Sequence, residues 1–267
     1  MKNVLVLVHD DVGQEARFQG ALDITRALGG HLTCIDVAIL PVVMGGFMEP
    51  SGTAMLMAEE AQRESANKAD MEARLKAEAV PYSWIDETGF LSPSVRDNAA
   101  RADIVVLNRV LDTIQYPDMR ELVGEVVVRT GKPIVAMPEL VKGFNARGNT
   151  LIAWDGSPSA VAAMHAAVPL LQRAGSVTIV EVDDGSIKLP AEVAAEYLAQ
   201  HGIKAGIRRE SNELNDTATV ILDSIAGTHA SYLVMGGFGH SRFVEAVLGG
   251  VTRRMLQECP IPLFLTH

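Results

Sequence analysis

Five glycines lie in one short stretch near the end of the sequence, LVMGGFGHSRFVEAVLGGVT at 233–252. Glycine is costly inside regular secondary structure, and it is most useful where the backbone needs a positive φ or must come close to a ligand. The pair Gly249–Gly250 precedes a predicted helix, VTRRMLQE, whose first amides and positive dipole end would favour an anion. The stretch therefore indicates either a set of turns or a loop that binds a phosphate group.

An acidic residue follows another predicted strand in the same half of the chain. The run TLIAWDG at 150–156 contains Asp155 near its end, and the glycine stretch follows the run SYLVM at 231–235. Ligands of an open doubly wound sheet bind at the carboxyl ends of its strands, where the strand order reverses. In a five-stranded unit that starts in the middle and winds both ways, the first and fourth strands flank that crevice. We therefore expect Asp155, which can accept a hydrogen bond from a ribose or a base, to face the glycines.

The elements that must position these residues come from two copies of one unit. Four apolar runs of the first half resemble four runs of the second half, at 4–10 and 150–156, 32–37 and 177–182, 102–107 and 230–235, and 132–138 and 261–267. At the offset of the second match, Asp10 pairs with Asp155 and Val37 pairs with Val182. Such internal repetition predicts two domains, 1–143 and 148–267, joined near 140–149.

Each copy alternates short β-rich apolar runs with helical patterns, which is typical of an α/β fold with a mainly parallel sheet and helices on both faces. The first copy has two further segments in its middle. A Met- and Gly-rich loop at 40–57 favours a hydrophobic cover, with a lid or a partner surface as alternatives, and a charged run at 54–79 predicts an exposed outer helix. The predicted strands are 3–9, 31–37, 81–86, 103–107 and 133–137 in the first copy, and 149–154, 176–182, 204–209, 231–235 and 261–266 in the second.

Composition and charge narrow the classes of function. The chain has 267 residues, of which 48% are apolar and 21% charged, as in a soluble globular protein with a large core. Its net charge of −10 disfavours nucleic acid as a partner, because it would repel the phosphates. No apolar run approaches the length of a membrane span, and the amino-terminal run is too short for a signal peptide. We therefore expect a cytoplasmic protein without a membrane partner.

No residue pattern predicts a metal site or a catalytic centre. Cys34 and Cys259 stand far apart in or beside apolar runs, which favours buried, inert thiols. The run His9-Asp10-Asp11 could suggest a metal, but acidic residues after a strand more often form turns and helix caps. No Ser–His–Asp order or carboxylate pair stands out, so efficient enzymatic turnover is not expected.

The spacing of the glycines identifies a family. Gly236, Gly239 and Gly249 follow the pattern G-x2-G-x9-G, which resembles the glycine motif G-x2-G-x9-G-[S/T] of the universal stress proteins. Other phosphate-binding motifs fit less well, since GxxxxGK[ST] is absent and GxGxxG fails because Arg242 occupies its last glycine position. The resemblance covers nearly the whole chain, and its two copies look like the tandem type of that family. It implies two tandem five-stranded, doubly wound domains of the adenine nucleotide alpha-hydrolase-like kind.

In that family the glycine motif surrounds the ribose and phosphates of ATP, so the resemblance implies a site for ATP or another adenine nucleotide, with Mg²⁺ left open. It places Asp155 on the adenosine side and Val182 against the adenine. It also brings Arg242 within reach of a phosphate, with a solvated arginine as the alternative. The residues that it places around the nucleotide are Ala153, Asp155, Gly156, Val182, Met235, Gly236, Gly239, His240, Arg242, Gly249, Gly250, Val251 and Thr252.

This chain departs from the family pattern at Gly250, where the motif has Ser or Thr. A lost hydrogen bond to a charged group is worth about 1.5–3 kcal/mol, which would weaken triphosphate binding roughly 10- to 150-fold. The first copy lacks the motif, since Asn108, Leu111 and Arg120 or Glu121 stand where the second has glycines. We therefore expect one nucleotide per chain, in the second copy, with the first copy as its partner.

Three functions remain open at this point. The first is a stress-response protein that changes its shape or its partner on binding adenine nucleotide. The second is an interaction protein that keeps the fold without the ligand, and the third is a slow ATP hydrolase. The runs at 132–138 and 261–267 would otherwise be exposed edge strands, and the resemblance implies that the two units pair through them. A monomer with an internal pseudo-dimer, or a homodimer of such chains, is expected.

Overall fold

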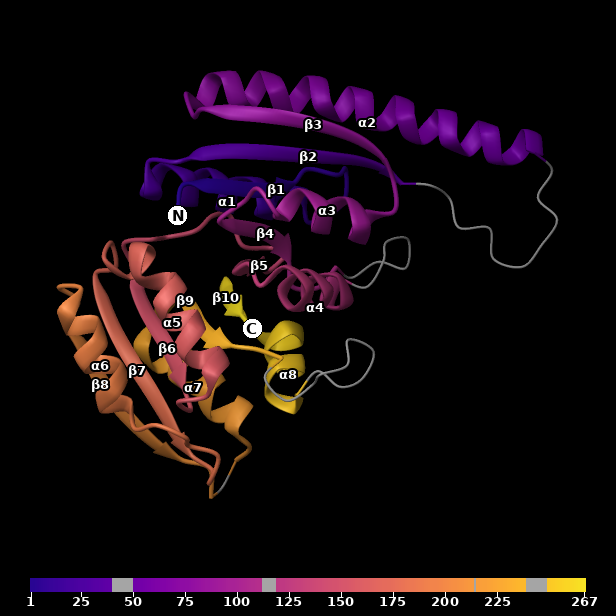
Figure 1. Cartoon of the computed structure of the whole chain (residues 1–267). Helices are drawn as coiled ribbons and strands as arrows, with labels where there is room; N and C mark the ends of the chain where they lie inside the picture. Colours follow the sequence, from indigo (N-terminus) through magenta and orange to yellow (C-terminus); the bar gives the residue numbers. More distant parts are fainter. Residues whose placement is uncertain (40–49, 112–118, 214, 239–248) are drawn as a thin grey trace.

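The computed structural model describes residues 1–39, 50–111, 119–213, 215–238 and 249–267 (Figure 1). Within these ranges every predicted strand is present, and the predicted α/β fold is confirmed. The strands are β1 (Asn3–Leu7), β2 (His31–Ile39), β3 (Tyr82–Gly89), β4 (Ile104–Asn108), β5 (Ile134–Met137), β6 (Asn149–Trp154), β7 (Ser176–Asp183), β8 (Ala205–Ser211), β9 (Ala230–Gly236) and β10 (Leu263–Thr266). The helices are α1 (Gln14–Leu28), α2 (Pro50–Glu78), α3 (Leu91–Ala99), α4 (Met119–Thr130), α5 (Pro158–Leu171), α6 (Ala191–Gln200), α7 (Thr217–Thr228) and α8 (Gly250–Glu258).

The described strands form one continuous sheet in the order β3-β2-β1-β4-β5-β10-β9-β6-β7-β8. Each half starts in the middle of its own five strands and winds both ways, as the repeat predicts. The neighbouring strands within each half are parallel, whereas β5 and β10 pair antiparallel, with Ala136 opposite Leu263 and Ile134 opposite Leu265. The prediction that the last strands of the two copies lie against each other is therefore confirmed, and this pairing joins the two halves (Figure 1).

Helices cover both faces of the sheet. One face packs against α1, α2, α5 and α6, through residues such as Val6, Ile152 and Phe264. The other face packs against α3, α4, α7 and α8, through residues such as Leu7 and Leu265. Because parallel strands are buried on both faces, they read as continuous apolar runs in the sequence, which is why their positions could be predicted.

The long helix α2 lies along the outside of the first half (Figure 1). Most of its described side chains are exposed, as expected for an outer helix, but Glu64, Met71 and Leu75 are buried against the sheet. Of the segment predicted as a Met- and Gly-rich loop, 40–49 lie outside the described residues, whereas 50–57 form the first turns of α2 rather than a loop. Near the start of α2, the side chains of Met55 and Leu56 are exposed.

Cys34 and Cys259 are both buried free thiols, as expected. Burial raises the pKa of the Cys34 thiol to about 12 and that of the Cys259 thiol to about 11. Thiolates, the reactive form, are therefore scarce at either position near neutral pH. In the described parts of the chain, no helix has both the length and the apolar composition that crossing a bilayer requires.

Candidate functional site

A cavity of about 480 Å³ opens at the carboxyl ends of β6, β7 and β9. The chain leaves β6 toward β7 and β8 and then returns to β9 on the other side of β6, so the strand order reverses at this point. The cavity is lined by nine of the residues expected around a nucleotide, namely Ala153, Asp155, Val182, Met235, Gly236, Gly249, Gly250, Val251 and Thr252. The expected residues Gly239, His240 and Arg242 lie outside the described residues.

One wall of the cavity is apolar. It is formed by residues from β6, β7, α7 and β9 whose side chains share the face of the sheet that α7 covers, namely Ala153, Val180, Val182, Ile221 and Met235. Most of these side chains are buried by their neighbours and leave only one side toward the cavity. A wall of this kind is suited to a flat, hydrophobic ring.

The amino-terminal ends of three helices also border the cavity. The first turns of α5 and α7 are capped by their own side chains, because the Ser157 hydroxyl accepts from the Ala160 amide and the Asp216 carboxylate accepts from the Ala218 and Thr219 amides. In contrast, the N-cap of α8 is Gly249, which has no side chain to accept a hydrogen bond. Among the described residues, no side chain caps the first amides of α8, and its positive dipole end favours an anion.

The glycines around the cavity serve two different purposes. At Gly236 a Cβ atom would lie 2.5 Å from the carbonyl carbon of Ser159 and overlap the amide nitrogen of Ala160, so β9 and the start of α5 can approach only without a side chain. A Cβ at Gly249 or Gly250 would meet no heavy atom of the described residues within 4 Å. Gly236 is therefore required by packing, whereas the Gly249–Gly250 pair leaves open space in front of α8.

Gly156 does not line the cavity. Its φ is +68°, a left-handed conformation that favours glycine, and a Cβ there would overlap the backbone of Leu189. The left-handed turn and the close approach of the following loop therefore explain why this position is glycine. The same loop is tied to the end of β6, because the Lys188 amide donates to the Asp155 carbonyl at 2.6 Å.

Two carboxylates lie in the cavity, and each has a local partner. Asp155 accepts from the Ser157 amide at 2.9 Å. Asp184 accepts from the Thr217 hydroxyl at 2.7 Å and from the Ser186 amide at 2.9 Å. Burial acts to raise the pKa of Asp184, but these hydrogen bonds outweigh it and hold the pKa below its ordinary value. Sequence reasoning missed Asp184 and Thr217, although both follow the general rule that polar residues at strand ends and helix starts gather at this edge.

The matching crevice of the first half is filled by its own side chains. Arg17 is fully buried, and its guanidinium donates to the carbonyls of Leu7 and His9 at 2.9 Å each, to Asp11 at 2.8 Å and to the side chain of Asn108. Asn108 ends β4 just as Gly236 ends β9, so the expected match between these two residues agrees with the strand register. A guanidinium and an amide thus occupy the space that the second half leaves open.

The strand register corrects one match made from the sequence. Val6 lies opposite Cys34 and Val106, whereas Ile152 lies opposite Ile179 and Val234. Val6 therefore corresponds to Ile152, and His9 rather than Asp10 takes the place of Asp155. The connection between the first two strands is one residue longer in the first half, so the offset that pairs Val37 with Val182 falls one residue short at the first strand. Asp11 has the turn role expected of it, because its carboxylate accepts from the Gly13 amide at 2.8 Å.

The first half also contacts Phe238 of the glycine segment and the end of α8. Phe238 has a φ of +64°, and its ring lies where a Cβ on Gly124 of α4 would meet it at 3.0 Å. Arg109, which follows β4, donates to the carbonyls of Leu256 and Gln257 near the end of α8. Burial lowers the pKa of the Arg109 guanidinium, which nevertheless carries its charge at any ordinary pH. The second half's cavity is thus held partly by the first half.

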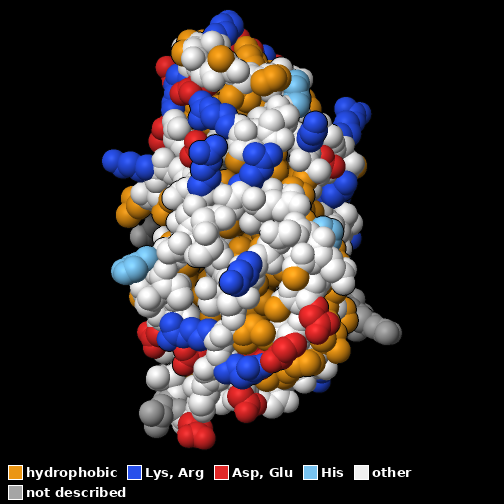
Figure 2. Space-filling model, turned by 90° about the vertical axis from the view of Figure 1, so that its left-hand side faces the viewer, with side chains coloured by type: hydrophobic (Ala, Val, Ile, Leu, Met, Phe, Trp, Pro, Cys, Tyr) orange, Lys and Arg blue, Asp and Glu red, His pale blue; other side chains and the backbone are white. Residues whose placement is uncertain are grey.

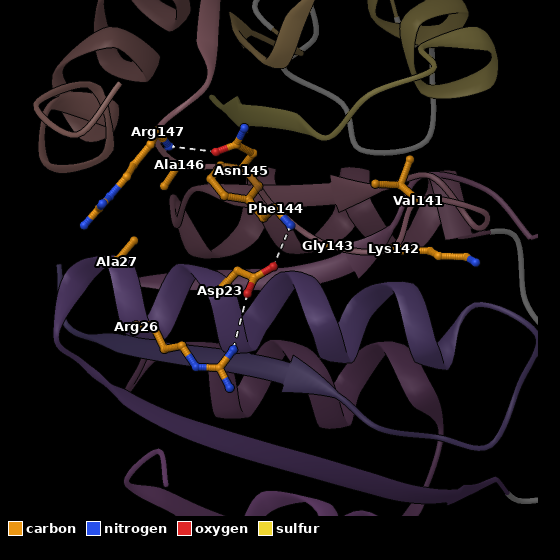
Figure 3. Close-up of a pocket in the computed structure, with 10 residues that line it drawn as sticks. All are labelled: Asp23, Arg26, Ala27, Val141, Lys142, Gly143, Phe144, Asn145, Ala146 and Arg147. Carbon is orange, nitrogen blue, oxygen red and sulfur yellow. Dashed lines mark hydrogen bonds and ion pairs between the residues drawn. The ribbon is translucent and has the colours of Figure 1, made fainter. Parts of the chain in front are cut away.

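A shallower depression of about 650 Å³ lies along the segment that joins the halves (Figure 3). Asp23 of α1 accepts there from the Phe144 amide at 3.0 Å and from Arg26 at 3.3 Å, and the buried Phe144 ring lies 4.7 Å from the Tyr232 ring of β9. These contacts fix the linker to both halves. Charged side chains of both signs are spread over the face drawn in Figure 2, without one sign covering it.

No family model and no curated protein sequence matches the chain. Solved structures do match. A universal stress protein from Archaeoglobus fulgidus DSM 4304 is similar over 98% of this chain and 95% of its own, with a TM-score of 0.75 and 16% identity. A putative universal stress protein from Pseudomonas aeruginosa UCBPP-PA14 is similar over 100% of this chain and 93% of its own, with a TM-score of 0.58 and 12% identity. At such identities the likeness concerns the fold, and the chain has the fold of the universal stress proteins in a tandem arrangement.

Proposed function

We propose that the second half binds one adenine nucleotide in the cavity at the carboxyl ends of β6 and β9, and that the protein acts in a stress response by changing shape or partner with the nucleotide. One observation carries the proposal. The start of α8, where Gly249 provides no side-chain cap, lines the same cavity as an apolar wall, so an anion and a flat ring can be bound by one molecule. A volume of about 480 Å³ is within the usual range for small-molecule sites.

The nucleotide would lie with its base on the apolar wall formed by Val182 and Met235. Its ribose would lie near Asp155, whose carboxylate accepts from the Ser157 amide through one oxygen and keeps the other for a hydroxyl. The phosphates would point toward Gly249 and Gly250 at the start of α8. The positive dipole end of that helix favours this direction.

Calorimetry with ATP, ADP and AMP tests the proposal. We expect about one nucleotide per chain. The variant Gly249→Asp places a carboxylate at the N-cap of α8, where it satisfies the same amides and repels a phosphate. It should therefore preserve or raise the stability of the fold while weakening ATP roughly 10- to 150-fold, the equivalent of one charge-assisted hydrogen bond. The matched control is Gly206→Asp, in β8, where a Cβ also meets no atom within 4 Å and which does not line the cavity.

A gain of function provides the opposite test. Gly250→Ser places a hydroxyl at the start of α8 and should strengthen ATP more than AMP, because only the longer ligand reaches that end of the cavity. A stoichiometry near two, or equal effects of Gly249→Asp and its control, would mean that the site is elsewhere. An absence of binding even in Gly250→Ser would instead favour an interaction protein without a nucleotide.

A further inference from the structure

A histidine and two carboxylates meet inside the first half. His9 follows β1, Asp36 lies in β2 and Glu64 comes from α2, and the three residues are at most 4% exposed. One nitrogen or oxygen of each lies within 4.8 Å of the others, and His9 Nδ1 is 2.9 Å from Glu64 Oε1. Two strands and the long outer helix thus converge on one buried point. His9 takes the place that Asp155 has in the second half.

The Glu64 carboxylate is held in a fixed orientation. Its Oε2 accepts from the Asp10 amide and from the side-chain amide of Asn67, each at 3.3 Å. Asn67 in turn donates to the Val8 carbonyl at 2.7 Å, which ties α2 to the end of β1. A carboxylate that is oriented by surrounding hydrogen bonds is typical of metal ligands, whose outer partners set their direction.

The Asp36 carboxylate lacks a partner for one of its oxygens. Asp36 Oδ1 is buried and has no hydrogen bond to any residue that the structure describes. Arg63 approaches Glu64 from outside at 3.5 Å, and Lys68 pairs with the exposed Asp86 rather than with Asp36. Two carboxylates are therefore buried beside one imidazole, an arrangement that is costly unless one carboxylate takes up a proton or a cation binds between them.

We propose that His9, Asp36 and Glu64 bind one divalent transition-metal ion such as Zn²⁺. An imidazole nitrogen with two carboxylate oxygens is a donor set that Zn²⁺ accepts in tetrahedral sites. The ion neutralises both carboxylates and gives the orphaned Asp36 oxygen a partner. Because the cluster is buried, the ion has a structural role and fastens α2 to β1 and β2. Neutral imidazole and ionised carboxylates are the binding forms, so the ion displaces protons as it binds.

The test uses the full chain, first stripped of metal with a chelator and then titrated with Zn²⁺ and with Co²⁺. We expect one ion per chain by native mass spectrometry, visible absorption bands from Co²⁺, and a melting temperature that rises with metal concentration. Glu64→Gln and Asp36→Asn keep the shape of each side chain and should each remove the bands and the thermal shift. Asp70→Asn is the matched control, because it removes an exposed carboxylate from the same helix.

Two results would overturn the proposal. The first is a chain that binds no Zn²⁺ or Co²⁺, which would mean that the cluster is held by shared protons alone. The second is equal metal binding by the wild type and by both cluster variants. Circular dichroism of each metal-free variant shows whether it is folded, and either of the two cluster variants is sufficient for the comparison. Metal binding is measured without nucleotide, so its outcome is independent of the function proposed for the second half.

Discussion

Replacing Gly236 by alanine tests whether the first glycine of the motif serves the fold rather than the ligand. The new methyl group would lie 2.5 Å from the Ser159 carbonyl carbon and overlap the Ala160 amide. Both neighbours are backbone atoms at the start of α5, so the strand and the helix must separate. Overpacking of this kind costs about 1–3 kcal/mol. For a chain of this size each kcal/mol lowers the melting temperature by roughly 2–4 °C.

The comparison variant is Gly250→Ala, where a Cβ meets no atom within 4 Å. This change should leave stability unchanged or raise it by about 0.4–1 kcal/mol, because alanine restricts the unfolded chain. Both variants are unfolded by urea and by heat without any nucleotide. Equal stability of Gly236→Ala and the wild type would refute the packing argument, and so would a Gly250→Ala variant as unstable as Gly236→Ala.

Three further predictions concern charged side chains. Arg17→Met leaves a buried carboxylate and two buried carbonyls without their donor and should cost about 3–5 kcal/mol in urea unfolding, whereas Arg26→Met, at an exposed site on the same helix, should cost less than about 1 kcal/mol. Arg109→Ala removes the donors that bridge the first half to the end of α8 and should lower the free energy of unfolding by about 1.5–3 kcal/mol. Hydrogen bonds from the Thr219 side chain and amide hold the pKa of Asp216 at about 2, below its ordinary 3.8, so its stabilisation is present above pH 4 and is lost as the pH falls toward 2. Asp216→Asn should remove that part of the acid dependence of the melting temperature.

The fold could be predicted from the sequence because its strands are apolar on both faces. Each run, such as VLVLV in β1 or SYLVM in β9, is long enough and sufficiently β-branched or aliphatic to be recognised alone. The repeat then supplied the order of the strands, and the need to cover two apolar edges gave the pairing of β5 with β10. The crevice between β6 and β9 follows from that order.

The individual contacts could not be predicted in the same way. Glu64 reaches His9 across more than fifty residues of sequence, and nothing in the local pattern of α2 distinguishes this carboxylate from its exposed neighbours. The match between His9 and Asp155 depends on which pair of strands sets the offset between the two copies, because the connection from the first strand to the second differs in length by one residue. Gly156, Gly236 and Gly249 cannot be told apart by residue type. Only the structure shows that a Cβ would overlap backbone atoms at Gly156 and Gly236 but would meet no described atom at Gly249.

The antiparallel join between β5 and β10 bears on how the two crevices diverged. Two separate copies of one unit, paired through the same strands, would form a symmetric dimer in which each substitution appears twice. In this chain the pair is covalent, so Asn108 can stand at one crevice while Gly236 remains at the other. Joining two such units in one chain thus allows their two crevices to differ. That half could accept Arg17 in its crevice and the long helix α2 across its surface, while the interface that both halves need is kept.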